Sequence, residues 1–121
     1  MDTIINCAAY TAVDRAEDEP GPAAEINTQA VANLAKAAQK EDCLLIHIST
    51  DYVFPGRGDR FYEPTDPVRP ENVYGRSKLA GELAVQSMLK NYFIVRISWV
   101  FGKNGNNFVK TMLRLAETRS E

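Results

Sequence analysis

Histidine and cysteine are scarce in this sequence, which has one His and two Cys among 121 residues. So few ligand side chains do not make a metal site, and His47, inside an apolar run, is expected to be a core residue without a catalytic role. Cys7 and Cys43 also lie in apolar runs, which favours two buried thiols over a disulfide or a metal pair.

Long apolar runs and excess charge are absent as well. No run approaches the roughly 18 apolar residues of a membrane-spanning helix, and no basic N-terminus leads into an apolar signal segment. We therefore expect a cytoplasmic protein with no membrane partner. The net charge of −2, with Lys and Arg scattered along the chain, gives no indication of nucleic-acid binding.

The composition that remains is ordinary for a globular protein, with 45% hydrophobic and 25% charged residues. Apolar runs typical of buried strands cover residues 3–9, 43–49 and 92–98. Apolar positions at helical spacing predict helices over 23–41, over 72–90 and from Phe108 onward. Because the connections between strands exceed a dozen residues, we predict an α/β domain with a parallel, three-stranded sheet and crossover helices.

The connection over residues 53–70 differs from the others. It contains four prolines and two glycines and is too long for a plain connection, so it is a candidate functional loop.

Polar or aromatic residues follow each predicted strand. In parallel sheets, ligands bind beyond the carboxyl ends of the strands. The three strand ends, Ala8–Thr11, Ser49–Tyr52 and Ser98–Val100, are therefore expected to meet at one edge of the sheet, together with Tyr74 and Lys78 at the start of the following helix.

Tyr74 and Lys78 are four residues apart, so on a helix they share one face at roughly 5–6 Å between Cβ atoms. The pKa of an unperturbed phenol is about 10. A neighbouring cation favours the phenolate and lowers this pKa toward neutrality. The pair could thus exchange a proton with a substrate. An exposed helical pair without a function has the same spacing, and only the surrounding residues favour the chemical interpretation.

Five segments carry a resemblance to a known family. They are Asn6–Asp14 (NCAAYTAVD), Ile48–Phe54 (ISTDYVF), Val73–Glu82 (VYGRSKLAGE), Arg96–Gly102 (RISWVFG) and Asn107–Leu115 (NFVKTMLRL). Together they closely resemble the dTDP-4-dehydrorhamnose reductases of the extended short-chain dehydrogenase/reductase superfamily. The Tyr-x-x-x-Lys and STDYVF motifs are shared with sugar-nucleotide epimerases and dehydratases, whereas WVFG and NFVKTM point to the reductases.

The resemblance implies reduction of the C4 ketone of dTDP-4-dehydro-6-deoxy-L-mannose by NADH or NADPH, giving dTDP-L-rhamnose. It implies that Tyr74 protonates the developing alkoxide. Lys78 would bind the nicotinamide ribose and hold the pKa of Tyr74 down. Thr50, where many relatives have Ser, would hydrogen-bond the same sugar oxygen. These three are the predicted catalytic residues.

Further roles follow from the same resemblance. Ala8, Ala9, Tyr10 and Thr11 match a strand end that passes along the cofactor. Asp51 and Trp99 match positions that contact the substrate sugar. For Asp51 a turn-capping role is the alternative, and for Trp99 it is plain packing.

The chain also departs from this family. Members begin with a strand and a Gly-rich turn that hold the cofactor pyrophosphate, but no glycine precedes Gly21 here. The resemblance therefore implies that the N-terminal dinucleotide-binding strands and the C-terminal substrate domain of the family lie outside residues 1–121. We therefore expect residues 1–121 to be a single partial Rossmann-like domain of a doubly wound sheet, a fragment that alone binds NAD(P)H poorly and is inactive.

An open parallel sheet edge tends to pair with another chain, so we expect self-association or a homo-oligomer. Any Mg²⁺ shared across a family dimer interface would lie outside this span, and the residue that selects NADH or NADPH belongs to the missing part.

Two other functions stay open. The first is a related sugar-nucleotide epimerase or dehydratase. The second is a non-catalytic regulatory subunit, which would have no need to retain Thr50, Tyr74 and Lys78 together.

Overall fold

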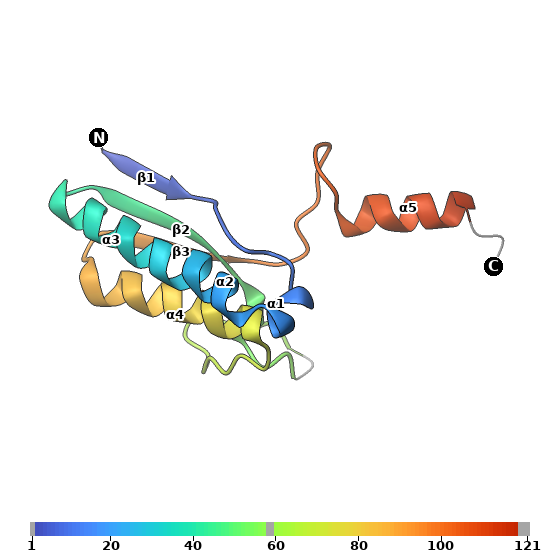
Figure 1. The fold of residues 1–121 in the computed structure, drawn as a ribbon, viewed down its shortest axis with the longest axis horizontal. Helices are drawn as coiled ribbons and strands as arrows, with labels where there is room; N and C mark the ends of the chain where they lie inside the picture. The colour runs from blue at the N-terminus through green and yellow to red at the C-terminus, as the bar shows by residue number, and fades with distance from the viewer. Residues whose placement is uncertain (1, 58–59, 119–121) are drawn as a thin grey trace.

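A computed structural model describes residues 2–57 and 60–118, and residues 58 and 59 of the predicted functional loop lie outside the described residues. The described residues form a three-stranded sheet in the order β1-β2-β3, with both pairs parallel. The strands are β1 (Thr3–Asn6), β2 (Leu44–Thr50) and β3 (Tyr92–Ile97). Figure 1 shows them side by side, each followed by helical structure. The predicted α/β class with a parallel sheet is confirmed.

The connection from β1 to β2 is mostly helical. It consists of α1 (Arg15–Asp18), α2 (Pro20–Ala24), the π-helix η1 (Glu25–Gln29) and α3 (Ala30–Lys40). The helical run starts at Pro20, three residues before the predicted start, because proline has no N–H to lose at the first helical position.

The connection from β2 to β3 holds the second packing helix. It contains the 3-10 turn η2 (Asp51–Val53), the long loop and α4 (Val73–Met88), and α5 (Phe108–Thr118) follows β3. Asn72 caps α4, since its side-chain oxygen accepts a hydrogen bond from the N–H of Gly75 at 2.7 Å. No helix among the described residues is long and apolar enough to cross a membrane.

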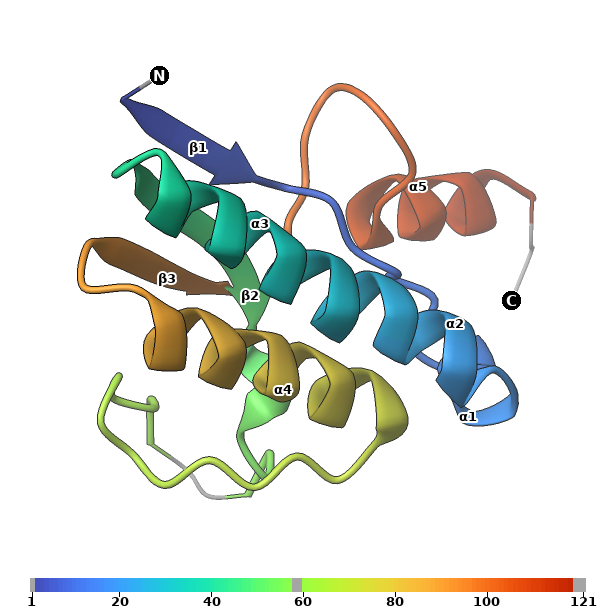
Figure 2. The same cartoon turned by 60° about the vertical axis from the view of Figure 1, so that its left-hand side comes forward.

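The apolar core lies between the sheet and the helices α3 and α4, which run next to each other in Figure 2. It contains small and branched side chains from both helices, from β2 and from the residues just before β2 and just after α4. These are Val31, Ala35, Ala38, Cys43, Leu45, Val85 and Leu89. Close packing of such side chains supplies most of the hydrophobic stabilisation of the sheet.

The opposite face of the sheet is open in this chain. Ile5 is 64% exposed and Phe93 is 61% exposed. Two right-handed crossovers that step in the same direction place both connecting helices on one face, so α3 and α4 cannot cover the other. The burial expected from the apolar runs is therefore wrong for the side chains on this face. The expected burial is confirmed for Cys43 but wrong for Cys7, which follows the end of β1 and is exposed.

Helix α4 approaches η1 very closely. A Cβ atom added at Gly81 would lie 2.2 Å from the backbone oxygen of Asn27, which is inside any normal contact distance. Glycine at this position is therefore required by the packing of the two helices and not by its backbone angles.

We expect Gly81→Ala to lower the free energy of unfolding by about 1–3 kcal/mol, the usual cost of overpacking. Urea unfolding of the chain measures this loss. Gly102→Ala is the matched control, because no atom outside the chain neighbours lies within 4 Å of a Cβ added there, and the change should leave the free energy of unfolding within about 0.5 kcal/mol. Equal unfolding midpoints for Gly81→Ala and the unchanged chain would contradict the close contact.

Candidate active site

One pocket collects the carboxyl ends of all three strands and the start of α4. It has a volume of about 320 Å³, and Thr50, Tyr74 and Lys78 line it together with Ala9, Thr11 and Trp99. The predicted convergence of the strand ends on one edge is confirmed. Ala8 and Tyr10 are not among the lining residues, and the Tyr10 hydroxyl instead donates to Glu19 Oε2 at 2.8 Å.

Tyr74 lies in the first turn of α4 and is buried. Its ring meets the ring of Tyr52 edge-on, with 5.6 Å between centroids. Burial raises the pKa of Tyr74, a hydrogen bond with the Thr50 side chain lowers it in part, and the nearby Asp51 raises it further. The prediction that a neighbouring cation lowers this pKa is wrong for this structure.

Lys78 explains that difference, because its ammonium group is bound elsewhere. Its side chain is only 1% exposed, and Nζ donates to the carbonyl oxygen of Ile48 at 2.7 Å. Burial lowers the pKa of Lys78, and the negative charge of Glu82 opposes this effect. The amine therefore lies in the pocket wall, anchored to the backbone of β2.

Hydrogen bonds of Thr50 and Asp51 connect the carboxyl ends of β2 and β3. The Thr50 hydroxyl accepts a hydrogen bond from the N–H of Tyr52 at 3.2 Å, so Thr50 caps the turn η2. The Asp51 carboxylate accepts from the hydroxyls of Thr50 at 3.2 Å and Ser98 at 2.7 Å. The capping role considered for Asp51 belongs to Thr50 instead, and Asp51 connects β2 to the end of β3.

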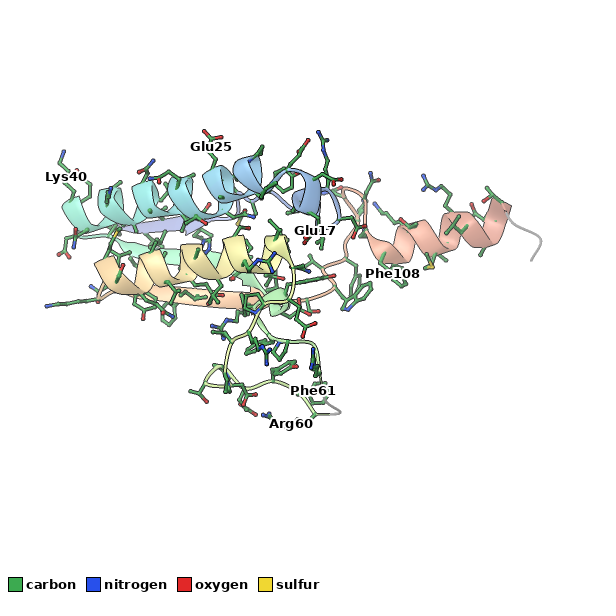
Figure 3. The ribbon with its side chains drawn as sticks, turned by 60° about the horizontal axis from the view of Figure 1, so that its bottom comes forward. Glu17, Glu25, Lys40, Arg60, Phe61 and Phe108 are labelled. Atoms are coloured by element: carbon green, nitrogen blue, oxygen red, sulfur yellow. The ribbon has the colours of Figure 1, made fainter. Side chains whose placement is uncertain are left out.

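Trp99 forms part of the pocket rim in an unusual backbone conformation. Its φ angle is 50°, in the left-handed region that costs a non-glycine residue about 1–3 kcal/mol. The indole is 72% exposed and meets the ring of Phe108 edge-on at 4.8 Å. Phe108 lies at the end of α5 nearest the sheet, as Figure 3 shows. A side chain this exposed is not held there by core packing.

Asn27 was not predicted to belong to the site. It is fully buried in the π-helix η1, and its side chain accepts from the N–H of Tyr10 at 2.9 Å and donates to the Tyr10 carbonyl at 3.0 Å. The same amide donates to the Ser77 hydroxyl at 3.0 Å. Asn27 thus fixes the segment after β1 against α4. A π-helix is often found at functional sites, but no sequence pattern announced this one.

A second missed group is a buried ion pair beside the pocket. Arg96 donates through Nη2 to Glu82 Oε2 at 2.7 Å and through Nε to Glu82 Oε1 at 3.1 Å. The Ser49 hydroxyl donates to Glu82 Oε1 at 2.5 Å. The available signal was an arginine between apolar strand residues and a glutamate one helical turn after Lys78.

His47 is a buried core residue, as predicted, but only one of its ring nitrogens has a partner. Asn6 Oδ1 accepts from the N–H of Ala8 at 3.1 Å, so the amide nitrogen of Asn6 faces His47 Nδ1 at 3.1 Å. His47 Nε2 is buried without a partner among the described residues. Burial, and secondly the charge of Lys78, lowers the pKa of His47 to about 4. At neutral pH His47 is therefore uncharged.

We expect the chain to lose stability as the pH falls from about 6.5 toward 4, because the unfolded His47 then binds a proton that the folded one refuses. Between pH 7 and pH 5 this costs about 2 kcal/mol. Urea unfolding at both pH values measures the loss, and His47→Gln should remove that part of it. An equal loss in both proteins would show that His47 is accessible to protons in the folded chain.

The parallel α/β sheet, with a Tyr-x-x-x-Lys helix and a threonine hydroxyl at its carboxyl edge, defines the Rossmann-like fold of the extended short-chain dehydrogenases/reductases. The profile of the family described as "RmlD substrate binding domain" matches residues 1–121, and the chain belongs to this family.

Individual relatives agree with this placement. The dTDP-4-dehydrorhamnose reductase of Escherichia coli (strain K12) is 54% identical over 120 residues, which are 99% of this chain and 40% of that protein. The crystal structure of the reductase from Bacillus anthracis str. Ames in complex with NADP has a TM-score of 0.93 and 50% identity, covering 97% of this chain and 42% of that one. The reductase ortholog from Clostridium acetobutylicum ATCC 824 also gives 0.93, at 44% identity over 97% of this chain and 41% of its own.

The chain spans about 40% of the length of the curated relatives. The resemblance noted in the sequence is therefore confirmed at the level of the family, and the activity of the whole protein is a matter for proposal.

Proposed function

We propose that these residues, within the full length of their relatives, reduce the C4 ketone of dTDP-4-dehydro-6-deoxy-L-mannose to give dTDP-L-rhamnose. The observation that carries the proposal is the shared pocket of Thr50, Tyr74 and Lys78 in a chain whose relatives are named dTDP-4-dehydrorhamnose reductases. The 121 residues alone form one partial Rossmann-like domain, for which we expect no turnover.

Tyr74 is the proton donor in this proposal. Reduction of a ketone requires a proton for the alkoxide, and the raised pKa of Tyr74 keeps its phenol protonated at neutral pH. The Thr50 side chain would bind the same sugar oxygen, and its hydrogen bond with Tyr74 supports this role. Lys78 contributes a cation in the pocket wall that favours negative charge on that oxygen.

The pocket suits only part of a dinucleotide. Lys78, Ala9 and Thr11 offer an amine and small side chains, which fit a ribose and a flat ring beside the backbone. The pyrophosphate half has no matching residues, because the first glycine of the chain, Gly21, lies inside α2 and no Gly-rich turn follows β1. When bound, NADPH would supply the hydride, and the NADP complex of the B. anthracis reductase supports this choice over NADH.

Asp51 and Trp99 are the proposed substrate contacts. The Asp51 carboxylate keeps acceptor capacity beyond its bonds to Thr50 and Ser98, which suits a sugar hydroxyl. The exposed indole of Trp99 offers an apolar face on which a sugar ring can stack.

Location and assembly are part of the proposal. We infer that the protein is cytoplasmic. We also infer that it associates through its sheet edges, because β1 and β3 each have one side without a neighbouring strand among the described residues. The described residues hold no cluster of three or more His, Cys, Asp or Glu side chains that could bind a metal ion, and a shared Mg²⁺ is not part of the proposal.

The reductase is favoured over an epimerase or dehydratase because the relatives at about half identity are named reductases. A regulatory subunit would have no need of a buried amine and a protonated phenol in one pocket.

The test uses a chimera in which residues 1–121 replace the matching segment of the E. coli reductase. We expect this chimera to oxidise NADPH in the presence of dTDP-4-dehydrorhamnose. Tyr74→Phe should lower kcat by about 10²–10⁴-fold, the usual contribution of a positioned general acid. Product analysis should find dTDP-L-rhamnose.

Two controls complete this test. Tyr92→Phe removes a hydroxyl at the start of β3, outside the pocket, and should leave kcat within about twofold. The 121-residue chain alone should bind NADPH too weakly for calorimetry at micromolar concentration. Turnover of Tyr74→Phe within a few-fold of the unchanged chimera would refute the catalytic assignment.

A further inference from the structure

Glu82 is a carboxylate in a place where an uncompensated charge would be very costly. It lies on α4 one turn after Lys78 and is fully buried. Its two oxygens are bound by Ser49 of β2 and by Arg96 of β3. The carboxylate therefore ties three elements together behind the pocket.

Arg96 extends this contact to the long loop. Its Nη1 donates to the carbonyl oxygen of Pro64 at 3.1 Å, and its guanidinium lies over the ring of Phe54 at 5.0 Å from the centroid. Phe54 stacks in turn on Tyr62, with 4.4 Å between centroids. The positive charge of Arg96 is thus compensated by Glu82, by a carbonyl oxygen of the loop and by an aromatic ring.

Ser49 connects the carboxylate to the pocket. It immediately precedes Thr50 on β2, and its hydroxyl bond to Glu82 is short at 2.5 Å. Because neighbouring strand residues point to opposite faces, fixing Ser49 toward α4 also fixes the direction in which Thr50 leaves the strand.

We propose that Glu82 is a positioning residue of the reductase site, which places Thr50 through Ser49 and sets a buried carboxylate one helical turn from the amine of Lys78. This inference rests on the proposed function, which it deepens by adding a residue that touches neither sugar nor cofactor.

The charged groups around Lys78 support the electrostatic part. On α4 itself, Glu82 favours the cation and raises the pKa of Lys78 against the effect of burial. On β2, His47 is neutral above pH 4, and on β3, Arg96 is paired. Figure 3 shows Glu25 of η1 and Lys40 of α3 pointing away from α4.

Two further carboxylates lie close to the start of α4. Glu17 of α1 accepts a hydrogen bond from the N–H of Val73 at 2.7 Å. The negative charge of Asp51 in η2 raises the pKa of Tyr74. The carboxylate whose charge raises the pKa of Lys78 is Glu82.

The first test needs no activity. In the ¹³C-lysine-labelled chain, NMR titration of the Lys78 side chain, assigned with Lys78→Arg, should give a pKa lower by about one unit in Glu82→Gln than in the unchanged chain. Glu71→Gln is the matched control, because this half-exposed carboxylate pairs with Arg57 at 2.7 Å on the surface. An unchanged pKa in Glu82→Gln would overturn the electrostatic role.

If Glu82→Gln fails to fold, the double variant Glu82→Gln with Arg96→Gln replaces it, since no buried charge then lacks a partner. A fall in the pKa of Lys78 is still expected there, but a smaller one because the Arg96 cation is removed as well, and an unchanged or raised pKa would count against the proposal.

The second test measures the pH dependence of kcat in the chimera. Glu82→Gln should move the alkaline limb to lower pH by about one unit, while Ser49→Ala should lower kcat about tenfold and leave that limb in place. A kcat reduced equally at every pH in Glu82→Gln would show a merely structural residue. An inactive unchanged chimera would refute the proposed function, whereas the NMR titration would still decide the role of Glu82.

Discussion

The structure depends on a polar face of α4 that is buried against the sheet and against η1. Ser77, Lys78 and Glu82 lie on this face, and each forms at least one hydrogen bond with a neighbouring element. Burying such groups is tolerated only when partners are in place, so the contacts leave little freedom for the helix. Gly81 has no side chain, so the backbone of α4 packs directly against the backbone of η1 at Asn27. A helix held in this way presents Tyr74 at one fixed position.

The topology turns this constraint into a site. Parallel strands bring their carboxyl ends to one edge, and the crossover through α4 starts at that same edge. Asn27 holds the segment after β1 and Asp51 joins the ends of β2 and β3, so each strand end has its own polar anchor. The pocket is consequently assembled by side chains that do not themselves react.

The sequence predicted the parts whose physical cause is local. Apolar runs identified the strands, and the four-residue spacing of Tyr74 and Lys78 placed both on one face of a helix. It did not predict pairs that only the fold creates, such as Glu82 with Arg96 or Asn27 with Tyr10. It also gave the wrong direction for the pKa of Tyr74, because that depends on where the amine of Lys78 points. An apolar run likewise cannot reveal which face of its strand is covered, as Ile5 demonstrates.

The central claim is that the hydroxyl of Thr50 and the phenol of Tyr74 act as one unit on a single oxygen. A double-mutant cycle in the chimera, with Thr50→Val, Tyr74→Phe and both together, tests it through kcat. Residues that act as a unit show strongly non-additive losses, so the double variant should be no slower than Tyr74→Phe alone. Losses that multiply across the two positions would mean that the two groups act separately, and the account would be contradicted.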